Sequence, residues 1–454
     1  MSAKIDTSLG TRPIGELLRA YALPSIIAMT ASSVYNTMDS VFIGQGVGAL
    51  AIAGLSVTFP LMNLAAAFGS LVGVGSGTLV SVKLGQRDYD TARRVIGNTV
   101  LLNIVIGLIF TVVVLFFLDD ILRFFGATEQ TLQYARDYMT IIVGGNVITH
   151  LYLGLNSVLR AAGHPNESMR ATLNTVLINL ILDPLFIFVF HWGIRGAAIA
   201  TVIAQLASLL WQMKFFMSND GLMRIDKKSL RFDGKIIRNI IAIGMSPFLM
   251  NIASCVIVIL INRNLLYYGG NMAVGAFGIV NRMTFFFCMA VMGLNQGMQP
   301  IAGYNYGAEQ YDRVIAVLRI TAIAAILVTT TAFLAGEFAP YYIARMFTDD
   351  EQLIDISITG LRINFIVFPF VGFQMVAGNF FQSIGMAKKA IFLSLTRQVL
   401  FLIPMLIIFP KIWGLEGVWW ALPASDFTSF LVTTALLVWQ LRLFKNPQAI
   451  KADI

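Results

Sequence analysis

The apolar stretch 169–190 contains an amide and a carboxylic acid that could bind a cation or carry a proton. Asn179 and Asp183 are four residues apart, so both side chains lie on one face of a helix. Pro184 follows at once; because proline has no N–H, it leaves the carbonyl of Leu180 free and weakens the helix beside the acid. An ionised acid in hydrocarbon is costly, so we interpret Asp183 as a functional residue rather than a polar packing contact.

A second acid, Asp39, ends the apolar stretch 17–40. At the rise of an α-helix, Asp39 lies about 30 Å from the basic end of its stretch, and Asp183 lies about 21 Å from the basic end of its own. Both acids are therefore expected toward the outer side of a membrane. An acid this close to the interface can also reach water, but the matching depth favours a functional interpretation. Pro24, in the inner half of the same stretch, is a candidate bend point.

Other polar residues within apolar stretches are weaker candidates. Thr201 and Gln205 lie one turn apart in the stretch 194–217, and threonine hydroxyls in such helices usually bond a carbonyl of their own preceding turn. Asp426 is the only acid well inside a span of the second half, and it could be a second proton site or a partner for Arg282. The residues considered for a secondary or substrate-binding role are Asn174, Gln205, Arg282, Gln296 and Asp426.

The composition around these residues identifies a polytopic, all-α membrane protein. Of the 454 residues, 57% are hydrophobic and only 12% are charged, far below the charged fraction of a soluble domain. The apolar runs have the length of bilayer-crossing helices, and the alternation of a membrane barrel is absent. Twelve spans are predicted, at 17–40, 50–82, 93–118, 132–160, 168–190, 194–217, 236–262, 273–303, 312–336, 353–384, 388–410 and 417–443.

The basic residues predict the orientation of these spans. Of the 32 Lys and Arg, 24 lie in the termini or near the joints that follow even-numbered spans, so both termini are expected in the cytoplasm. The net charge of +8 therefore reports orientation, and nucleic-acid binding is not expected. Cys255 and Cys288 lie inside apolar runs and indicate neither a disulfide nor a metal framework.

The two halves of the sequence resemble each other. GQRDYD at 85–90 matches GAEQYD at 307–312 with an offset of 222. Nearly the same offset relates Gly75 to Gly297, Gly163 to Gly385, and GIRG at 193–196 to GLEG at 414–417. Six spans is an even number, so we expect two six-helix lobes related by a pseudo-two-fold axis along the membrane normal. The predicted parts are an N-terminal lobe at 1–217, a cytoplasmic linker at 218–235 and a C-terminal lobe at 236–454.

We interpret two features that resemble binding-site motifs as parts of the helix packing. GSLVGVGSG at 69–77 has glycines four residues apart in an apolar run, which is typical of a helix-packing seam and not of a phosphate-binding loop. His150 has no second ligand at metal spacing. Because no HExxH, histidine cluster or GxSxG is present, we expect neither an enzyme nor a cofactor.

Four motifs together resemble the MATE family of multidrug and toxin extrusion transporters. They are LNQGMQPIAGYNYGAEQYDRV at 294–314, MDSVFIG at 38–44, LRAAGHPNESM at 159–169 and NLILDP at 179–184. The resemblance covers essentially all twelve spans. It implies two six-helix lobes, alternating access, and export of organic cations or other amphipathic compounds driven by inward H⁺ or Na⁺.

Within this family the chain looks most similar to the DinF-like branch. There the coupling ion binds an Asp of the first helix, an Asn and an Asp of the fifth, and a Thr of the sixth. These positions correspond here to Asp39, Asn179, Asp183 and Thr201. The resemblance also implies that Pro24 bends the first helix when Asp39 is protonated, and Pro184 is the other candidate hinge.

The resemblance to the NorM-like branch is weaker. That branch also uses acids on the seventh and tenth helices, but this chain has none between Asp233 and Glu309, nor in the tenth span after Asp355. A second ion site of that kind is therefore not expected, and Asp426 is the one candidate replacement.

The sequence thus predicts a monomeric secondary antiporter of the bacterial inner membrane. Its expected partners are small organic cations or amphipathic drugs and the lipid bilayer, with H⁺ or Na⁺ as the coupling ion. A lipid-linked precursor flippase is the alternative, but it would need a strongly basic cleft, and the spans carry few basic residues beyond Arg282, Arg362 and Arg397. An intramembrane enzyme or a channel would need motifs that the sequence does not contain.

Overall fold

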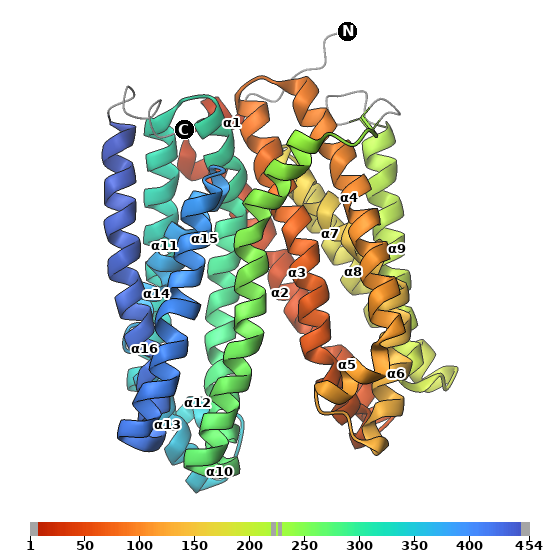
Figure 1. Ribbon diagram of the computed structural model, residues 1–454, viewed down its shortest axis with the longest axis vertical. Helices are drawn as coiled ribbons and strands as arrows, with labels where there is room; N and C mark the ends of the chain where they lie inside the picture. The colour runs from red at the N-terminus through yellow and green to blue at the C-terminus, as the bar shows by residue number, and fades with distance from the viewer. Residues whose placement is uncertain (1–7, 219–223, 226–228, 446–454) are drawn as a thin grey trace. The chain divides into compact units, whose positions relative to one another are not determined.

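The computed structural model describes residues 8–218, 224–225 and 229–445, and these form helices without a strand (Figure 1). A helix satisfies its own backbone hydrogen bonds, which long apolar runs in hydrocarbon require. The first half contains α1 Ser8–Thr11, α2 Ile14–Gly46, α3 Ala49–Gly85, α4 Tyr89–Phe116, α5 Leu118–Phe124, α6 Glu129–Gly144, α7 Asn146–Ala161, α8 Pro165–Pro184, the π-helix η1 Leu185–Val189 and α9 Gly193–Ser218. The second half contains α10 Gly234–Gly307, α11 Tyr311–Phe338, α12 Pro340–Arg345, α13 Glu351–Phe365, α14 Phe368–Ser383, α15 Ala387–Leu395, the π-helix η2 Thr396–Leu402 and α16 Ile403–Phe444.

These helices account for twelve membrane passes. By length and composition, eight of the described helices can cross a membrane, and two bent helix pairs raise the number to ten. Two of the eight contain a glycine with non-helical backbone, α10 at Gly270 and the α15 to α16 segment at Gly414. Each of these two covers two predicted spans, so the described residues contain twelve passes.

Two predicted spans are broken where a straight helix was expected. Span 132–160 divides at Gly145 into α6 and α7, which are bent by 54°, and span 353–384 divides into α13 and α14, bent by 51°. A β-carbon on Gly145 would lie 2.7 Å from Val202, so only glycine fits there. Pro369, at the start of α14, cannot donate a hydrogen bond to the preceding turn. Glycine and proline therefore explain the two bends.

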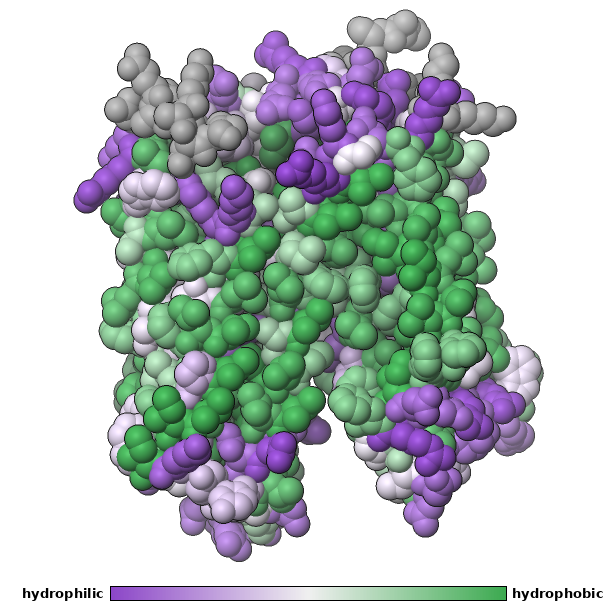
Figure 2. All heavy atoms as spheres, in the orientation of Figure 1, coloured by the Kyte–Doolittle hydropathy of each residue, from purple (hydrophilic) through white to green (hydrophobic). Residues whose placement is uncertain are grey.

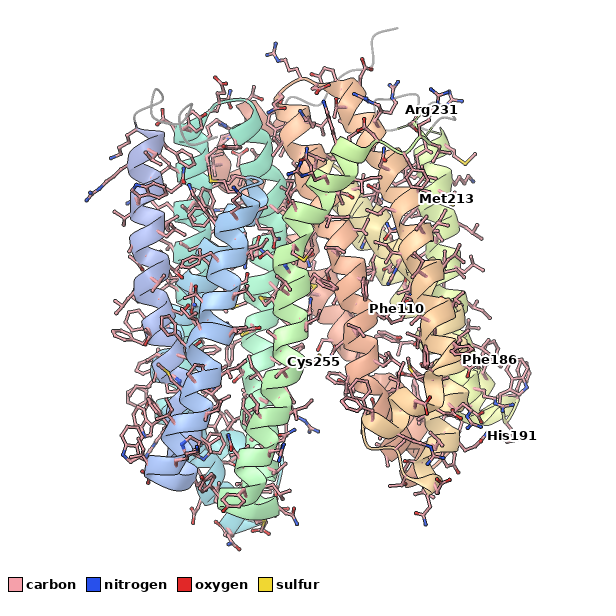
Figure 3. The ribbon with its side chains drawn as sticks, viewed as in Figure 1. Phe110, Phe186, His191, Met213, Arg231 and Cys255 are labelled. Atoms are coloured by element: carbon pink, nitrogen blue, oxygen red, sulfur yellow. The ribbon has the colours of Figure 1, made fainter. Side chains whose placement is uncertain are left out.

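Within each half, hydrophilic side chains gather at the two ends of the helices and hydrophobic side chains cover the length between them (Figure 2). Figure 3 places Met213 and Arg231 toward one end of the first half, and Phe186 and His191 toward the other. Between these ends the exposed side chains are largely apolar, as at Val112, which is 67% exposed. This distribution is that of a multi-pass membrane protein.

The predicted duplication is confirmed helix by helix. The bounds of α4 and α11 differ by 222 at both ends, and so do those of α7 and α14. An ion pair repeats at the same offset, with Arg123 and Glu129 2.6 Å apart in the first half and Arg345 and Glu351 3.2 Å apart in the second. Left-handed backbone positions repeat as well, in the pairs Arg87 with Glu309 and Gly163 with Gly385.

The chain divides into two compact units that differ from the predicted lobes at two segments. Unit 1 contains α1 and Ile27–Phe248, whereas unit 2 contains Arg12–Ile26 and the described chain from Leu249 onward. Helix α2 therefore begins in unit 2 and continues in unit 1. Helix α10 does the reverse, because its first residues belong to unit 1. Each unit thus includes a short segment from the other half of the sequence.

Repeat-related glycines allow these exchanged segments to pack closely. In unit 1, a β-carbon on Gly75 would lie 2.1 Å from the carbonyl oxygen of Ile240 in α10. In unit 2, a β-carbon on Gly297 would lie 2.6 Å from the backbone of Ala22 in α2. Gly75 and Gly297 are one of the glycine pairs that the sequence repeat relates, and at both places only a residue without a side chain fits.

Candidate functional site

Three helices of unit 1 bring together four buried polar residues, which we call the buried acid cluster. Helix α2 supplies Asp39, α8 supplies Asn179 and Asp183, and α9 supplies Thr201. Asn179 and Asp183 are fully buried, and Asp39 and Thr201 are 6% and 7% exposed. The four positions implied by the family resemblance therefore lie in one compact unit.

Asn179 connects the buried acid cluster through its side-chain amide. Its Nδ2 lies 3.1 Å from Asp183 Oδ1 and 3.3 Å from Thr201 Oγ1, so the amide is placed to donate to both. The Tyr35 hydroxyl is 3.2 Å from Thr201 Oγ1. The described partners of the Thr201 hydroxyl are thus on α2 and α8. The local sequence alone had favoured a bond from this hydroxyl to a carbonyl of its own helix.

The carboxyl groups of Asp39 and Asp183 interact directly, within hydrogen-bonding reach of each other. Two ionised carboxylates repel and neither can donate a hydrogen bond, so this contact is favourable only with a proton or a cation between them. Asp39 Oδ1, Asp183 Oδ2 and Asn179 Oδ1 are buried and have no protein donor among the described residues. Three such oxygens in one cluster could bind a proton or a hard cation.

The chain changes its helical form immediately after Asp183. Helix α8 ends at Pro184, and the π-helix η1 follows. Proline removes a backbone donor, and a π-turn shifts the backbone hydrogen-bond register, so the two features belong together. Phe186, in η1, packs against Phe190 and Trp192 with ring centroids 5.8 and 4.9 Å away, at the end of unit 1 that also carries His191 (Figure 3). The role of Pro184 as a hinge stays a prediction.

Two tyrosines join the buried acid cluster without having been singled out from the sequence. Tyr35 precedes Asp39 by one helical turn, and this spacing is the signal that could have found it. Tyr138 of α6 is 1% exposed and interacts electrostatically with Asp39 and Asp183. Its place depends on the packing of α6 against α3 and α9, which no local spacing reveals.

The residues considered for a secondary role lie in both units. Gln205 of α9 accepts a hydrogen bond from Thr149 of α7, and Asn174 of α8 is half-buried. In unit 2, Arg282 of α10 is exposed and Gln296 of the same helix is half-buried. Gln205 and Asn174 are therefore the two that share a unit with the buried acid cluster.

Asp426 pairs with a different arginine from the expected one. Its Oδ1 accepts a hydrogen bond from Arg397 Nε across 2.6 Å, so the suggested pairing with Arg282 is wrong. Arg397 lies on η2, which packs against the α16 helix of Asp426, while Arg282 is exposed on α10. A carboxylate that already has a guanidinium partner is a poor second proton site.

Pro24 lies inside α2, two residues before this helix passes from unit 2 into unit 1. The helix continues through it as far as Gly46. Its role as a bend point stays a prediction, and its place at the change of unit is the observation that supports it.

The glycine seam packs as the sequence predicted, and His150 is a buried histidine with one of its two ring nitrogens bonded. His150 is fully buried, and its Nε2 lies 3.0 Å from the Ala65 carbonyl oxygen. Gly73 and Gly77 of α3 would each place a β-carbon 3.3 Å from Ser157 of α7, which is the close approach of a packing seam. In the part of the chain that the structure describes, no group of three His, Cys, Asp or Glu could hold a metal ion.

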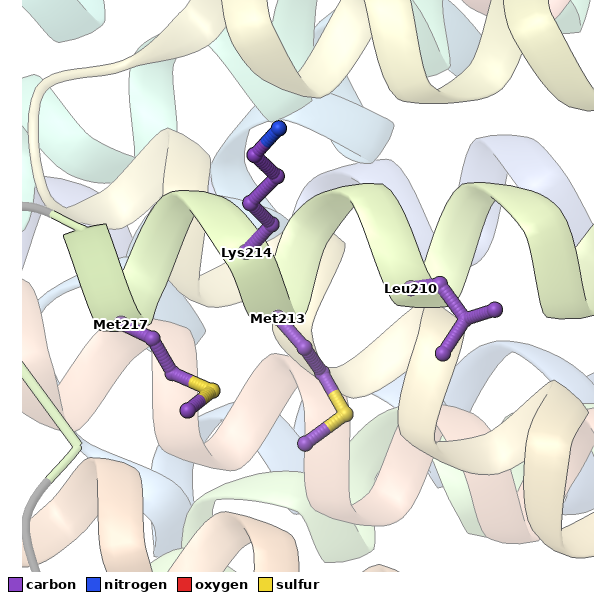
Figure 4. Close-up of a pocket in the computed structure, with 4 residues that line it drawn as sticks. All are labelled: Leu210, Met213, Lys214 and Met217. Atoms are coloured by element: carbon purple, nitrogen blue, oxygen red, sulfur yellow. The ribbon is translucent and has the colours of Figure 1, made fainter.

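An apolar groove on α9 is lined by residues outside the buried acid cluster (Figure 4). Leu210, Met213, Lys214 and Met217 line it at helical spacing, near the end of unit 1 that carries Arg231 (Figure 3). Leu210, Met213 and Met217 are long apolar side chains, and Lys214 between them points to another side of the helix, as suits the boundary between lipid tails and headgroups (Figure 4). We therefore assign this groove to contact with the bilayer.

The chain matches known proteins over nearly its whole length. The family model described as MatE matches residues 24–185 and 242–408. The multidrug export protein MepA of Staphylococcus aureus (strain NCTC 8325 / PS 47) is 28% identical over 429 residues, which are 94% of this chain and 93% of MepA. The solved structure of the MATE multidrug transporter DinF-BH in complex with rhodamine 6G is 34% identical, with a TM-score of 0.90 over 98% of this chain and 99% of that one.

A second solved structure has the same fold at lower identity. It is an outward-facing multidrug resistance MATE family transporter, 22% identical, with a TM-score of 0.91 over 98% of this chain and 100% of that one. The similarity to DinF-BH agrees with the DinF-like branch expected from the motifs. The chain therefore belongs to the MatE family of membrane transporters and is not an enzyme.

Proposed function

We propose that this protein is a secondary antiporter that exports organic cations and other amphipathic compounds in exchange for H⁺ or Na⁺. The direct contact between Asp39 and Asp183, beside three buried oxygens without a protein donor, is the observation that carries the proposal. The names of similar proteins support the direction and the kind of cargo, because MepA is a multidrug export protein and DinF-BH was solved with rhodamine 6G.

Exchange follows if the ion and the substrate oppose each other's binding. A proton or Na⁺ between Asp39 and Asp183 lowers the negative charge of the ionised pair from two to one, which weakens its attraction for a cationic compound. Once the ion has left, the uncompensated negative charge favours a cation again. Alternating access would let the ion arrive from outside and the substrate from the cytoplasm, and thermodynamic linkage makes the effect of each on the other reciprocal.

We propose that the protein is a monomer of a bacterial inner membrane with both termini in the cytoplasm, and the basic residues support this orientation. Of the 32 Lys and Arg, the 24 near one set of joints and the termini indicate the cytoplasmic side. The end of unit 1 near Arg231 is then cytoplasmic, and the end near His191 is external (Figure 3).

A lipid-linked precursor flippase is less well supported. It would bind pyrophosphate through a cluster of basic side chains, and Arg282, Arg362 and Arg397 were the arginines considered for that role. One of them, Arg397, already donates to Asp426. We therefore keep export of cations as the proposal.

Transport by the purified protein in lipid vesicles tests the proposal, with a pH gradient and a Na⁺ gradient imposed separately. We expect one gradient alone to drive transport of rhodamine 6G, and we expect Asp183→Asn to abolish it because the amide cannot release a proton or neutralise a cation. Asp137→Asn is the matched control, since Asp137 lies in the same unit but pairs with Arg195 at 2.8 Å. Full transport by Asp183→Asn would overturn the proposal.

A further inference from the structure

A second polar feature of unit 1 extends from the buried acid cluster along one face of α8. The buried polar residues on this face are Ser168, Thr172, Thr175, Asn179 and Asp183, which we call the α8 polar stripe. Their spacings of four, three, four and four residues keep them on one side of the helix. The stripe is about 22 Å long at the rise of an α-helix. Its far end lies at the start of α8, toward the proposed cytoplasmic side.

Helix α7 presents a matching polar face to the stripe. Tyr152, Asn156 and Arg160 follow one another at intervals of four residues. The Tyr152 hydroxyl donates to Thr172 Oγ1 across 3.5 Å. Asn156 Nδ2 donates to Thr172 Oγ1 across 3.1 Å. Tyr152 and Asn156 thus both hold the Thr172 hydroxyl of the stripe.

Arg160 stands at the cytoplasmic end of the stripe. Its two terminal nitrogens donate to Ser168 Oγ at 3.0 Å and to Ser157 Oγ at 3.1 Å. No ion pair of Arg160 with a carboxylate occurs in the described chain, and the nearby Glu167 pairs with Arg170 at 2.9 Å. The guanidinium therefore keeps its positive charge without an acidic counter-ion.

At the other end, hydroxyl groups bring the stripe to the buried acid cluster. Thr175 Oγ1 donates to Ser208 of α9 across 2.7 Å. Asn179, one turn beyond Thr175 on the same face, is placed to donate to Asp183 and to Thr201. Polar side chains from α2, α7, α8 and α9 thus extend from the acids to Arg160.

Several buried polar atoms next to the stripe have no protein partner among the described residues. They include Asn156 Oδ1 and both polar side-chain atoms of Gln212, which is fully buried one turn beyond Ser208 on α9. Buried polar atoms are satisfied by internal water when the protein offers no partner. Hydroxyls and ordered water together can form a continuous hydrogen-bonded chain.

We propose that the α8 polar stripe is the route by which the coupling proton leaves the buried acid cluster for the cytoplasm. This proposal rests on the proposed antiport function and deepens it. Asp183 gives its proton to the first hydroxyl or water; each member accepts one proton and passes on its own, and one proton is released beside Arg160. No member of the chain is left charged. Tyr152 acts as a positioning residue, because its hydroxyl donates to Thr172 and orients it.

The same contacts disfavour Na⁺ on this route. Thr172 and Ser168 already accept N–H hydrogen bonds from Asn156 and Arg160. A sodium ion would have to replace these donors and then pass an unpaired guanidinium. A proton needs only that hydroxyls turn away from the carbonyls of their own helix, to which Thr172 and Thr175 donate, and that water completes the chain. The titratable and charged groups that face the route are Asp39 and Tyr35 of α2, Tyr138 of α6, and Tyr152 and Arg160 of α7.

Two conservative variants test the route in vesicles with an imposed pH gradient. Tyr152→Phe keeps the ring and removes the hydroxyl, and Thr172→Val keeps the shape of the side chain. We expect each to slow transport of rhodamine 6G by about tenfold, which corresponds to a barrier increase of about 1.4 kcal/mol. Equilibrium binding of the dye should stay unchanged, and the slowing of transport in D₂O should become larger. Thr99→Val is the matched control, since Thr99 is also buried and bonds its own helix at Val95, but lies on α4.

The outcomes separate this inference from the proposed function. Wild-type transport rates in both variants, with Asp183→Asn inactive, would overturn the route and leave the antiporter in place. Transport driven by a Na⁺ gradient alone would do the same. Full transport by Asp183→Asn would overturn both. If one variant is recovered in too small an amount, the other gives the same comparison, because the two remove opposite ends of one hydrogen bond.

Discussion

Arg397 Nε donates to Asp426 Oδ1 across 2.6 Å, and this ion pair has no counterpart at the repeat-related positions of the first half. At an offset of 221, Asp426 corresponds to Gln205 and Arg397 corresponds to Val176. The first half instead has its acids, Asp39 and Asp183, in contact with each other. Two halves with the same helix bounds therefore differ in electrostatics: one contains a neutralised acid and the other an acid pair that needs an ion.

The pair in unit 2 should be measurable as a coupling energy. Arg397→Met leaves a mostly buried carboxylate without its partner, and Asp426→Asn leaves the guanidinium without its acid, so each should lower the melting temperature. The fall in melting temperature of the double variant should be smaller than the sum of the falls in the two single variants. A thermal-shift cycle measures this, and the exposed pair of Arg123 and Glu129 serves as a control with coupling near zero. Additive losses at Arg397 and Asp426 would contradict the prediction.

Substrate affinity should depend on pH through the buried acid cluster. A proton shared by Asp39 and Asp183 removes negative charge, so the affinity for a cationic compound should rise as the pH rises and the proton leaves. Equilibrium binding of rhodamine 6G to the purified protein, measured from mildly acidic to mildly basic pH, checks the sign. The affinity of Asp183→Asn should depend less on pH, while that of Asp137→Asn should depend on pH as in the wild type. Affinity that falls with rising pH would rule out this competition.

Close packing of the exchanged segment should make Gly75 intolerant of any side chain. A β-carbon there would lie 2.1 Å from the Ile240 carbonyl oxygen, so Gly75→Ala should destabilise the protein by about 2 kcal/mol or more. Gly144→Ala is the matched control, because it is helical, belongs to the same unit and has open space around it. That change should be neutral or stabilising by up to about 1 kcal/mol. Melting temperature and the yield of monodisperse protein are the measurements.

The start of α11 should gain stability from the cap that α4 already has. Asp88 accepts a hydrogen bond from the Thr91 backbone at the start of α4, whereas Gln310, with nearly the same backbone angles, makes no such side-chain bond at the start of α11. Gln310→Asp should therefore stabilise the protein by about 0.5 to 1 kcal/mol at neutral pH. Gln310→Ala is the control, and equal melting temperatures for the two would contradict the prediction.

The gain from Gln310→Asp should also depend on pH with a known sign. Partial burial by itself raises the pKa of Asp88, but hydrogen bonds from Thr91 and Lys83 lower it below its usual range. A carboxyl group with a lowered pKa in the folded state adds stability above its unfolded pKa and loses it as the pH falls. If Asp at position 310 behaves as Asp88 does, its advantage over Gln310 should shrink on acidification through the ordinary range of an aspartate.

Much of the fold and part of the site followed from the sequence because the signals were local. The spacing of Asn179 and Asp183 placed both on one helix face, and the rarity of acids in apolar runs singled out Asp39. The offset of 222 predicted which helices would match. These inferences use the periodicity of one helix, the cost of one buried charge, or a direct match between two segments of the sequence.

Other features depended on packing between distant helices and could not be predicted in this way. Tyr138 reaches the acids from α6, which gives no sign of it in its own sequence. Asp426 was given the wrong partner because the choice between Arg282 and Arg397 depends on how η2 packs against α16. Gly145, at the break between α6 and α7, packs against Val202 of α9, a residue far away in the sequence.

The exchange of short helical segments between the two units has a consequence for each half of the sequence. A single six-helix repeat, folded alone, would lack the segment that fills the space beside Gly75 or Gly297, and only a second copy could supply it. Two such repeats as separate chains would have to exchange these segments as a domain-swapped homodimer does. In one chain the exchange is intramolecular and independent of concentration. The two halves of one chain also need not be identical, and here one contains the Arg397–Asp426 pair while the other has its acids in contact.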